Sequence, residues 1–473
     1  MTARPDGDAG RVRWRVALPL AVALGGIGCL AAWVLLRLIW FVTNLLFWHR
    51  VGFASAEAHA APWASAPWTV LILAAGGLVA GLAIRYGHAS LAGHGIPEVM
   101  EAVALREGRI PPRVAGLKPL CAALVIGTGG PFGAEGPIIQ TGAALGSVLG
   151  QWLPVRPAER RVLIACGAAA GMTGIFGTPA AAVLLPVELF TFEFSLRAIA
   201  PAAVAAGVAA VLRGPLLGYR PLFAMHAAPG AGIDGLFWCL ALGALAGLEA
   251  VGLTRVLYWL EDLFAAIPGT GPVTRPLIGA VCVGLIALAG PEVLGVGYDL
   301  IRAMLNGQLA PPELLRILGF KSAGWLIALA SGTVGGVLAP LFMIGGATGA
   351  LLGHLIEPWS HLSPELVALV FMAAVFGAAG RALLTASVFA VEVTGDFHAI
   401  VPVLVATAVA TALADRLLPY NVMTGKLVRR GLRVQQDFFA APVGAPEVGA
   451  VACTLTGPGG GGPHGGRGAG ARG

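Results

Sequence analysis

Charged residues are scarce in this sequence. Asp, Glu, Lys and Arg make up only 11% of its 473 residues, whereas soluble globular domains carry about 25%. Hydrophobic residues reach 57%. A chain with so little charge does not suit the surface of a soluble protein. The composition therefore excludes that class and predicts a polytopic membrane protein.

Lysine is the rarest charged residue, found only as Lys118, Lys321 and Lys426. The formal net charge of +6 comes largely from arginine clusters between apolar segments and at both ends of the chain. Basic residues beside apolar segments are typical of positive-inside anchoring. The pattern therefore argues against a nucleic-acid partner, and it favours a cytoplasmic place for both ends.

Cysteine pairs are also missing. None of the six cysteines belongs to a CxxC motif, and five of them lie in apolar runs. This spacing excludes a disulfide framework and a zinc site. The sequence has no HExxH motif and no convincing Ser/His pair, so we expect no enzyme, no cofactor and no metal. The six residues are Cys29, Cys121, Cys166, Cys239, Cys282 and Cys453.

Glycine and proline, by contrast, are abundant, with 69 and 33 residues and no collagen period. The first apolar run, Val16 to Leu46, is too long for a signal-peptide core, so we expect it to be retained. Many later runs are shorter than the roughly 20 residues needed to span a bilayer, which predicts discontinuous helices around a midplane site. The expected helices lie near 67–85, 89–105, 117–127, 138–152, 160–173, 179–192, 197–213, 235–264, 275–290, 311–330, 340–355, 364–377, 382–393 and 399–415.

A repeated pattern divides the chain. The proline and spaced glycines of residues 137–150 return at 340–353, at an offset of 203. Val187-Glu188 returns as Val391-Glu392, at an offset of 204. Glycines four residues apart form one small-residue helix face, so each copy is expected to pack closely on a neighbouring helix. We predict two homologous halves, and the pattern alone leaves open whether they are inverted or parallel.

These features define the expected domains. Residues 16–432 form the membrane domain, with the repeated halves at about 67–213 and 270–415. Residues 1–15 form a polar N-terminal segment. Residues 433–473 form a C-terminal tail that is glycine-rich and is expected to be disordered from about residue 457.

One glutamate occupies an unusual position, in Gly133-Ala134-Glu135-Gly136-Pro137 at the start of an apolar run. Pro137 suits the first turn of a helix, and the glycines allow close approach of the backbone. The free N–H groups at such a helix end attract an anion, and Glu135 is itself an anion that would compete there. An ionisable group at that depth indicates function. The alternative is a helix-capping carboxylate in an exposed loop.

Two other stretches have the same construction. Gly336-Val337-Leu338-Ala339-Pro340 is the second copy of the glutamate stretch, and Leu338 stands at the position of Glu135. Gly93-His94-Gly95-Ile96-Pro97 is a third stretch, in which glycine and proline interrupt an expected helix. Half-helix N-termini aimed at one point would hold an anion without a full cationic partner.

With these three stretches the sequence resembles the CLC family of chloride channels and chloride/proton antiporters. The family motifs GSGIP, GREGP and GxFxP are matched in order, and its closing tyrosine is matched by Tyr420 in Leu418-Pro419-Tyr420-Asn421. The resemblance covers about residues 20–430. It implies an all-α polytopic fold of two inverted repeats with many short, broken and tilted helices. It also implies a homodimer with one pore per subunit in the plasma (inner) membrane of a bacterium.

The resemblance assigns roles to individual residues. Glu135 is expected to be the gating glutamate, which blocks the outer anion site when ionised and moves away when protonated or displaced. Tyr420 is expected to offer its hydroxyl to a central anion, although an interfacial tyrosine also fits its position. The bound ligand would be chloride or another halide-like anion. The expected anion-binding residues are His94, Gly95, Ile96, Gly136, Pro137, Ile138, Val337, Leu338, Ala339 and Tyr420.

Three departures from the family pattern bear on the anion path. His94 replaces the central serine, and a histidine donates one hydrogen bond when neutral and carries a charge when protonated. Acid pH is then expected to strengthen anion binding, unless His94 points away and only backbone amides bind. Ala134 replaces the arginine of GREGP, and Leu338 replaces the phenylalanine of GxFxP. The outer site thus loses a nearby cation, and the pore wall is reshaped.

The fourth departure concerns protons. Leu189 stands where antiporters of the family carry an inner proton-transfer glutamate, and leucine carries no proton. Glu188 or Glu193 would be the substitutes, although the repeat partner Glu392 favours a structural role for Glu188.

Two lysines lie inside apolar segments. Lys118 and Lys321 either supply positive field to the conduction path or extend to an interface.

The sequence therefore predicts transport of chloride or a similar small anion through a CLC-type pore, passive or weakly coupled to protons. The alternative is a chloride/proton antiporter with another inner acid. A fluoride exporter is less favoured, because Gly136-Pro137 follows the chloride-type pattern. The partners are a small anion, protons, a lipid membrane and a second copy of the chain.

Overall fold

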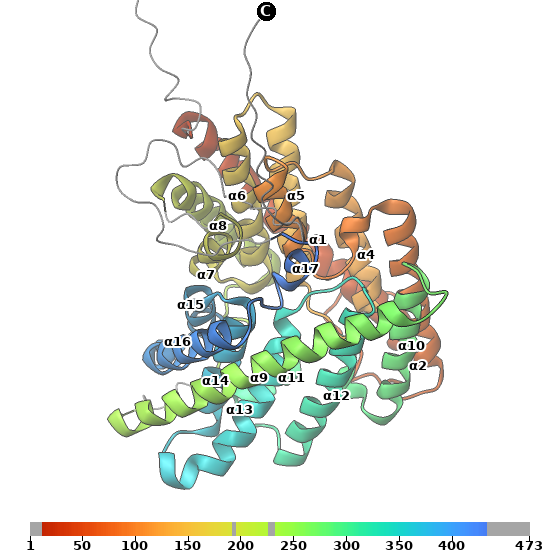
Figure 1. Cartoon of the computed structure of the whole chain (residues 1–473), viewed down its shortest axis with the longest axis vertical. Helices are drawn as coiled ribbons and strands as arrows, with labels where there is room; N and C mark the ends of the chain where they lie inside the picture. The colour runs from red at the N-terminus through yellow and green to blue at the C-terminus, as the bar shows by residue number, and fades with distance from the viewer. Residues whose placement is uncertain (1–11, 192–194, 226–231, 433–473) are drawn as a thin grey trace, which may run out of the picture.

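The computed structural model describes residues 12–191, 195–225 and 232–432 (Figure 1). The predicted tail at 433–473 and Glu193 lie outside these residues. Within them the chain is helical, and extended pairing is confined to two isolated bridges. The first half contains α1 (Trp14–Phe47), α2 (Trp68–Leu82), α3 (Ile96–Leu105), α4 (Pro112–Gly127), α5 (Glu135–Trp152), α6 (Pro157–Phe176), α7 (Pro179–Pro186) and α8 (Leu196–Leu217).

The second half repeats this order. It contains α9 (Ile233–Ala266), α10 (Thr274–Ala289), α11 (Tyr298–Leu305), α12 (Pro311–Ala330), α13 (Leu338–Ser360), α14 (Pro364–Gly380), α15 (Leu383–Thr394) and α16 (Ile400–Leu417), followed by the single-turn helix α17 (Gly425–Arg429).

The helices differ widely in length. Six helical stretches of the described residues, in α1, α2, α8, α9, α13 and α16, are long and apolar enough to cross a membrane. By contrast, α3 has 10 residues and α7 and α11 have 8 each. At 1.5 Å per residue, a helix of 10 residues is about 15 Å long, half of a bilayer core of about 30 Å. The prediction of a polytopic, all-α fold with many short and broken helices is confirmed.

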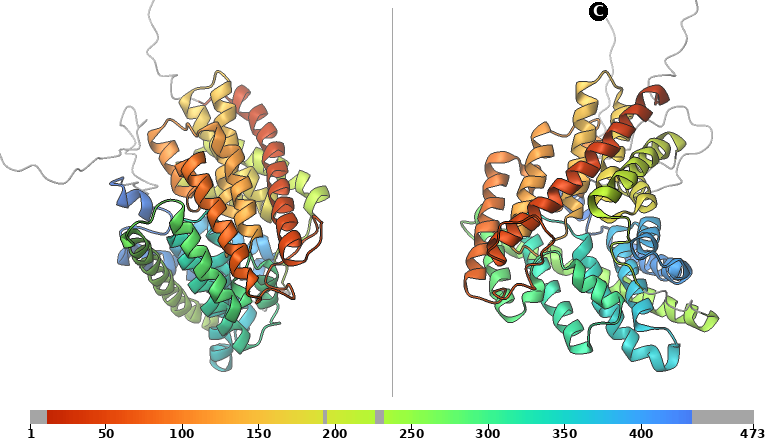
Figure 2. Two further views of the ribbon diagram at one scale, coloured as in Figure 1. Left: turned by 90° about the vertical axis from the view of Figure 1, so that its right-hand side faces the viewer. Right: turned by 180° about the vertical axis from the view of Figure 1, so that it is seen from behind.

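The two halves pack in equivalent ways. Helix α1 packs on α6 and α8, and α9 packs on the matching α14 and α16. Both α1 and α9 have 34 residues. They lie on opposite faces, with α9 in front in Figure 1 and α1 in front when the molecule is seen from behind in Figure 2. The structural halves therefore include α1 and α9 and extend beyond the predicted bounds of 67–213 and 270–415. The sequence did not show this, because α1 and α9 share length and packing but no sequence motif.

Two glutamates reveal how the halves are related. The carboxylate of Glu188, after α7, accepts the N–H groups of Leu384 and Thr385 at the start of α15, at 2.9 and 2.7 Å. Its repeat partner Glu392, on α15, accepts the N–H groups of Ala180 and Ala181 at the start of α7, at 3.0 and 2.8 Å. A contact made in both directions between equivalent elements requires a pseudo-two-fold axis between them.

The spaced glycines bring helices into backbone contact. A Cβ atom added at Gly142 on α5 would overlap the carbonyl group of Gly167 on α6. In the second half, a Cβ atom added at Gly349 on α13 would lie 2.8 Å from the carbonyl oxygen of Val367 on α14. Both glycine faces therefore pack on the next helix, as their spacing predicts. This packing fixes the position of α5 on α6 and of α13 on α14, and therefore the positions of their N-terminal ends.

The close contact of α5 with α6 yields a stability prediction. Gly142→Ala should lower the free energy of unfolding by about 1–3 kcal/mol, because the added methyl group has no space against the Gly167 backbone. The matched control is Gly252→Ala on α9, where nothing lies within 4 Å of the added atom. Thermal unfolding in detergent, followed by tryptophan fluorescence, should show a loss for Gly142→Ala only. Equal changes in both variants would contradict the packing argument.

Candidate functional site

Three loops meet where α3, α5 and α13 begin. The N–H of Gly93 donates to the carbonyl of Thr333 at 3.2 Å, and the N–H of Gly336 donates to the carbonyl of Gly133 at 3.0 Å. These bonds form the two isolated bridges of the structure. Segments from residues 93, 133 and 336 are thereby held side by side. The N-termini of three helices, α3, α5 and α13, converge on one buried point.

The junction depends on glycine at two positions. Gly95 has a φ of 86° in the left-handed region, which a glycine adopts without steric cost. At Gly136, an added Cβ atom would lie 2.5 Å from the carbonyl oxygen of His94 and 3.1 Å from the Cα atom of Gly336. The backbones of α5, α3 and α13 could not approach each other with side chains at these places.

Each of these helix starts leaves amide donors free of intrahelical bonds. The first such bonds run from Val99 to Gly95, from Ile138 to Ala134 and from Leu341 to Val337. The N–H groups before them have no acceptor within their own helix. Ile138, which we predicted to bind the anion, therefore has its N–H engaged. Among the predicted residues, Ile96, Gly136, Leu338 and Ala339 carry N–H groups that lie before these first intrahelical bonds, and the Ala339 N–H interacts with the Glu135 carboxylate.

Glu135 fills part of this junction. Its side chain is fully buried, so the alternative of an exposed capping carboxylate is wrong. Its Oε1 atom accepts a hydrogen bond from the Tyr298 hydroxyl at 3.1 Å, and Oε2 has no hydrogen-bond partner among the described residues. Oε2 lies against Gly133 and 2.8 Å from the position of a Cβ atom at Gly336. The carboxylate thus occupies the space between the starts of α5 and α13.

Tyr298 is a site residue that the sequence analysis missed. It begins α11, a helix absent from the predicted set because it is short and carries charged residues. Its ring packs edge-on against Phe176 and Phe223, at centroid distances of 6.2 and 5.6 Å. A signal was present, since Gly295-Val-Gly297 before Tyr298 repeats the Gly93-His-Gly95 pattern of the first half.

His94 lies on the other side of the junction. The residue is 2% exposed, and its Nδ1 atom has no hydrogen-bond partner in the described part of the chain. A small cavity beside it is lined by Tyr258, Val422 and Lys426. The ammonium group of Lys426 would lie 2.5 Å from a Cβ atom at Gly93. The sequence analysis therefore missed a cation of the site, Lys426, which lies beside the loop of residues 93–97, the GHGIP loop.

Tyr420 packs against Tyr258, which lines this cavity, and has no described contact to His94. Its ring meets that of Tyr258 at 90°, with centroids 5.4 Å apart. The Tyr258 hydroxyl donates to the carbonyl of Val422 at 3.1 Å. The role of Tyr420 at a central anion stays a prediction.

The two lysines in apolar segments lie at equivalent positions and make equivalent hydrogen bonds to backbone carbonyls. Lys118 on α4 donates to the carbonyls of Leu91 and Gly93 at 2.8 and 2.9 Å. Lys321 on α12, which is 203 residues further along, donates to the carbonyls of Val293 and Gly295 at 3.2 and 2.6 Å. Both side chains are fully buried, so neither extends to an interface. Each holds an entrance loop and places positive charge behind it.

None of the described positions considered for inner proton transfer carries a carboxylate free of other contacts. Leu189 is fully buried, and Glu193 lies outside the described residues. The carboxylate of Glu188 accepts two backbone N–H groups of α15 and the hydroxyl of Thr385 at 2.5 Å. Its oxygens are therefore committed to a helix cap.

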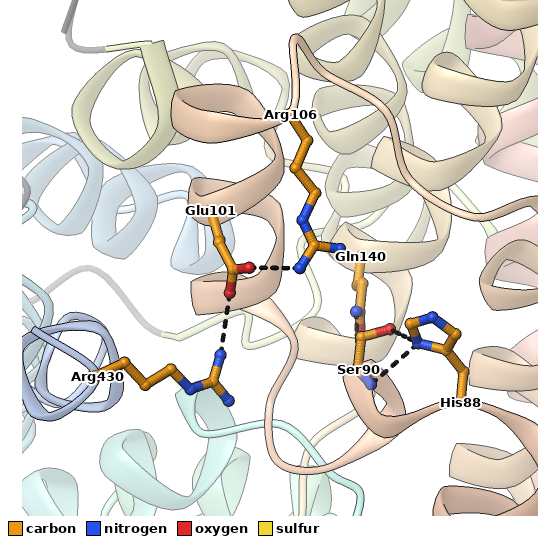
Figure 3. A network of polar contacts seen from close by, with 6 residues as sticks. All are labelled: His88, Ser90, Glu101, Arg106, Gln140 and Arg430. Atoms are coloured by element: carbon orange, nitrogen blue, oxygen red, sulfur yellow. Dashed lines mark hydrogen bonds and ion pairs between the residues drawn. The ribbon is translucent and has the colours of Figure 1, made fainter. Parts of the chain in front are cut away.

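A polar network joins α3 to neighbouring segments of the chain (Figure 3). Glu101 on α3 accepts hydrogen bonds from Arg106 at 2.5 Å and from Arg430 at 3.0 Å. Gln140 on α5 donates to the carbonyl of Ser90 at 3.0 Å. These residues line a cavity of about 250 Å³ together with His88. The network ties α3 and the chain before it to α5 and α17.

Comparisons with known proteins agree with this architecture. The profile described as "Voltage gated chloride channel" matches residues 76–415. A ClcB-like protein of Ralstonia nicotianae is 30% identical over 400 residues, which cover 82% of this chain and 91% of the relative. The H(+)/Cl(−) exchange transporter ClcA of Vibrio cholerae is 30% identical over 73% of this chain and 75% of its own length.

Solved structures are similar as well. The crystal structure of a slow cyanobacterial Cl−/H+ antiporter superposes with a TM-score of 0.76 at 25% identity, over 89% of this chain and 99% of the antiporter. A fluoride/proton antiporter superposes with a TM-score of 0.72 at 24% identity, over 87% and 98% of the two chains, and shows likeness of fold alone.

The caps formed by Glu188 and Glu392 give a second prediction. Glu188→Gln and Glu392→Gln should each lower the free energy of unfolding by about 1–2 kcal/mol, because each loses a charged acceptor for paired backbone N–H groups. The two variants serve as matched controls for each other in thermal unfolding. If Glu188 were instead a proton carrier, Glu188→Gln would leave stability unchanged and abolish proton-linked transport.

Proposed function

Because the chain belongs to the voltage-gated chloride channel (CLC) family of integral membrane proteins that transport anions, we propose that it carries chloride or a similar small anion through a pore gated by Glu135. The movement is passive or only weakly coupled to protons. The observation that carries the proposal is the buried Glu135 carboxylate at the point where α3, α5 and α13 begin. The family transports ions and is not one of enzymes.

The chemistry of the junction suits a small anion. The amide donors at the starts of α3, α5 and α13 have no intrahelical acceptors, and the positive ends of three helix dipoles point at the same place. In a membrane interior, unsatisfied backbone groups cost several kcal/mol each. An anion and the Glu135 carboxylate compete to satisfy them. When the carboxylate is neutral or displaced, an anion takes its place.

Three lysines, of which Lys118 and Lys321 are buried, place positive charge near the carboxylate and near His94. Lys321 interacts electrostatically with Glu135, and Lys118 and Lys426 do so with His94. Ala134 and Leu338 leave the outer site without the arginine and phenylalanine of the family pattern. On the inner side of the anion path, His94 replaces a serine, and Lys426 adds a cation beside it. His94 and Lys426 together set the selectivity among small anions.

Weak proton coupling follows from the inner acids. Leu189 cannot carry a proton, and the Glu188 carboxylate is committed to the cap of α15. A second function is supported by the relatives, since one is described as an H(+)/Cl(−) exchange transporter and one as a Cl−/H+ antiporter. That alternative is chloride/proton exchange through another inner acid. We further propose a homodimer with one pore per subunit.

The proposal is tested by chloride efflux from proteoliposomes with simultaneous recording of external pH. Wild-type protein should move chloride with little or no linked proton movement. Glu135→Ala should move chloride with no dependence on external pH, because the competing carboxylate is gone. Stoichiometric proton uptake that Glu135→Ala abolishes would establish the exchange alternative. Absence of flux with chloride, bromide, nitrate and fluoride would refute anion transport.

The cation at the GHGIP loop gives a separate prediction. Lys426→Met should weaken chloride binding about tenfold, or about 1.4 kcal/mol, because the inner end of the path loses its ammonium group. Lys426→Arg, which keeps the charge, is the matched control and should retain most of the affinity. Calorimetric titration of the purified protein with chloride measures both. Equal losses in the two variants would show that shape matters there and charge does not.

A further inference from the structure

A second group of ionisable side chains lies beside the gating glutamate. Glu57 and His59 come from the segment 48–67, which joins α1 to α2, and Asp299 comes from the start of α11. The Nε2 atom of His59 lies 3.1 Å from Oδ2 of Asp299. One ligand atom from each of the three residues lies within 4.8 Å of the others. No spacing in the sequence predicts this group, since Glu57 and Asp299 are far apart in the chain.

The group lies on the face of the membrane opposite to the N-terminus. The segment 48–67 follows the C-terminal end of α1, and a helix of 34 residues is about 50 Å long, enough to cross a bilayer. With the basic N-terminal end in the cytoplasm, the group lies at the outer face. The Asp299 side chain is 43% exposed, so the group is open to solvent on one side.

The three residues have unused ligand capacity. The His59 side chain is only 9% exposed, points at Asp299 and has no hydrogen-bond partner for its Nδ1 atom among the described residues. The buried Oδ1 atom of Asp299 also has no partner there. Glu57 accepts a single long bond of 3.4 Å from the N–H of Gly297. Buried polar groups without partners are costly, so the group is incomplete as it stands.

Its negative charge is only partly balanced. Glu57, Asp299 and Glu135 all interact with the one ammonium group of Lys321. That lysine is already engaged with the carbonyls of Val293 and Gly295. A further cation at the open side would complete the charge balance.

We propose that Glu57, His59 and Asp299 form an external binding site for a divalent transition-metal ion of the Zn²⁺ class. One imidazole and two carboxylates are a ligand set that Zn²⁺ accepts, with water in the fourth position. The 3.1 Å between His59 and Asp299 is close to the separation of two ligands on one Zn²⁺ ion, since each bond is about 2.0–2.2 Å long. Ca²⁺ and Mg²⁺ fit less well, because they require more oxygen ligands and avoid imidazole.

The site connects directly to the gate. Asp299 is adjacent in the chain to Tyr298, whose hydroxyl donates to Glu135 at 3.1 Å. A bound ion fixes the first turn of α11 and with it the Tyr298 ring. That ring then keeps the Glu135 carboxylate in its buried position, so the ion inhibits anion movement. This inhibition rests on the proposed function, whereas binding of the ion does not.

Binding is tested on the purified full-length protein in detergent with ZnCl₂ and MgCl₂ as probes. Zn²⁺ should raise the unfolding temperature of the wild type, and Mg²⁺ at the same concentration should not. His59→Gln should weaken Zn²⁺ binding about tenfold or more. The matched control His49→Gln changes an exposed histidine at the start of the same segment, 48–67, and should bind as the wild type does.

Several results would overturn the site. These are no Zn²⁺ effect on the wild type, an equal effect in His59→Gln, or an equal effect of Mg²⁺. Asp299→Asn provides a second check, since it keeps the size of a ligand and removes its charge. It should weaken binding in the same direction as His59→Gln.

Inhibition is tested by flux. Zn²⁺ added to the outer face should lower the anion flux of the wild type and of His49→Gln, and should leave His59→Gln unaffected. Tyr298→Phe should still bind Zn²⁺ while its own flux becomes insensitive to the ion. Binding without any loss of flux would overturn the link to the gate and leave the metal site standing. A wild type without any anion flux would instead refute the proposed function, while the unfolding measurement would still decide the metal site.

Discussion

The structure depends on one electrostatic constraint, which is that backbone amides at the start of a helix need an acceptor when they are buried in a membrane. Helices α3, α5 and α13 all begin at one buried junction, and most of their first N–H groups have no partner in their own helices. An anion is a suitable acceptor at such helix ends, because the N–H groups and the positive end of the helix dipole both attract negative charge. Glu135 supplies one from the chain itself. The same position then suits a mobile anion, which makes the carboxylate both a structural ligand and a competitor.

The rest of the fold holds the N-terminal ends of α3, α5 and α13 in fixed positions relative to one another. Close glycine packing places α5 on α6 and α13 on α14, and the buried ammonium groups of Lys118 and Lys321 fix the loops before α3 and α11. The reciprocal caps of Glu188 and Glu392 join the two halves about the pseudo-two-fold axis. The symmetry is broken at the junction itself, where Leu338 in the second half occupies the position equivalent to Glu135 in the first. Only one half therefore carries the competing charge.

Much of this arrangement could be predicted from the sequence. The Gly/Pro stretches identified the starts of α3, α5 and α13, and the offset of 203 residues identified two halves. The equivalence of α1 and α9 was missed, because it lies in length and packing. Helix α11 was missed because eight residues with an Asp and an Arg carry little apolar signal. Tyr298, Lys426 and the group of Glu57, His59 and Asp299 depend on contacts between segments far apart in the chain, which no local pattern encodes.

The central claim is that an anion binds where the three helices begin and that Glu135 competes for its place. Anomalous diffraction from crystals of wild-type protein and of Glu135→Ala, both grown in bromide, tests it most directly. The account predicts bromide at the junction in both proteins and, in Glu135→Ala, a further peak between Gly133 and Gly336, where the carboxylate lies in the wild type. Bromide absent from the junction in both crystals would contradict the account.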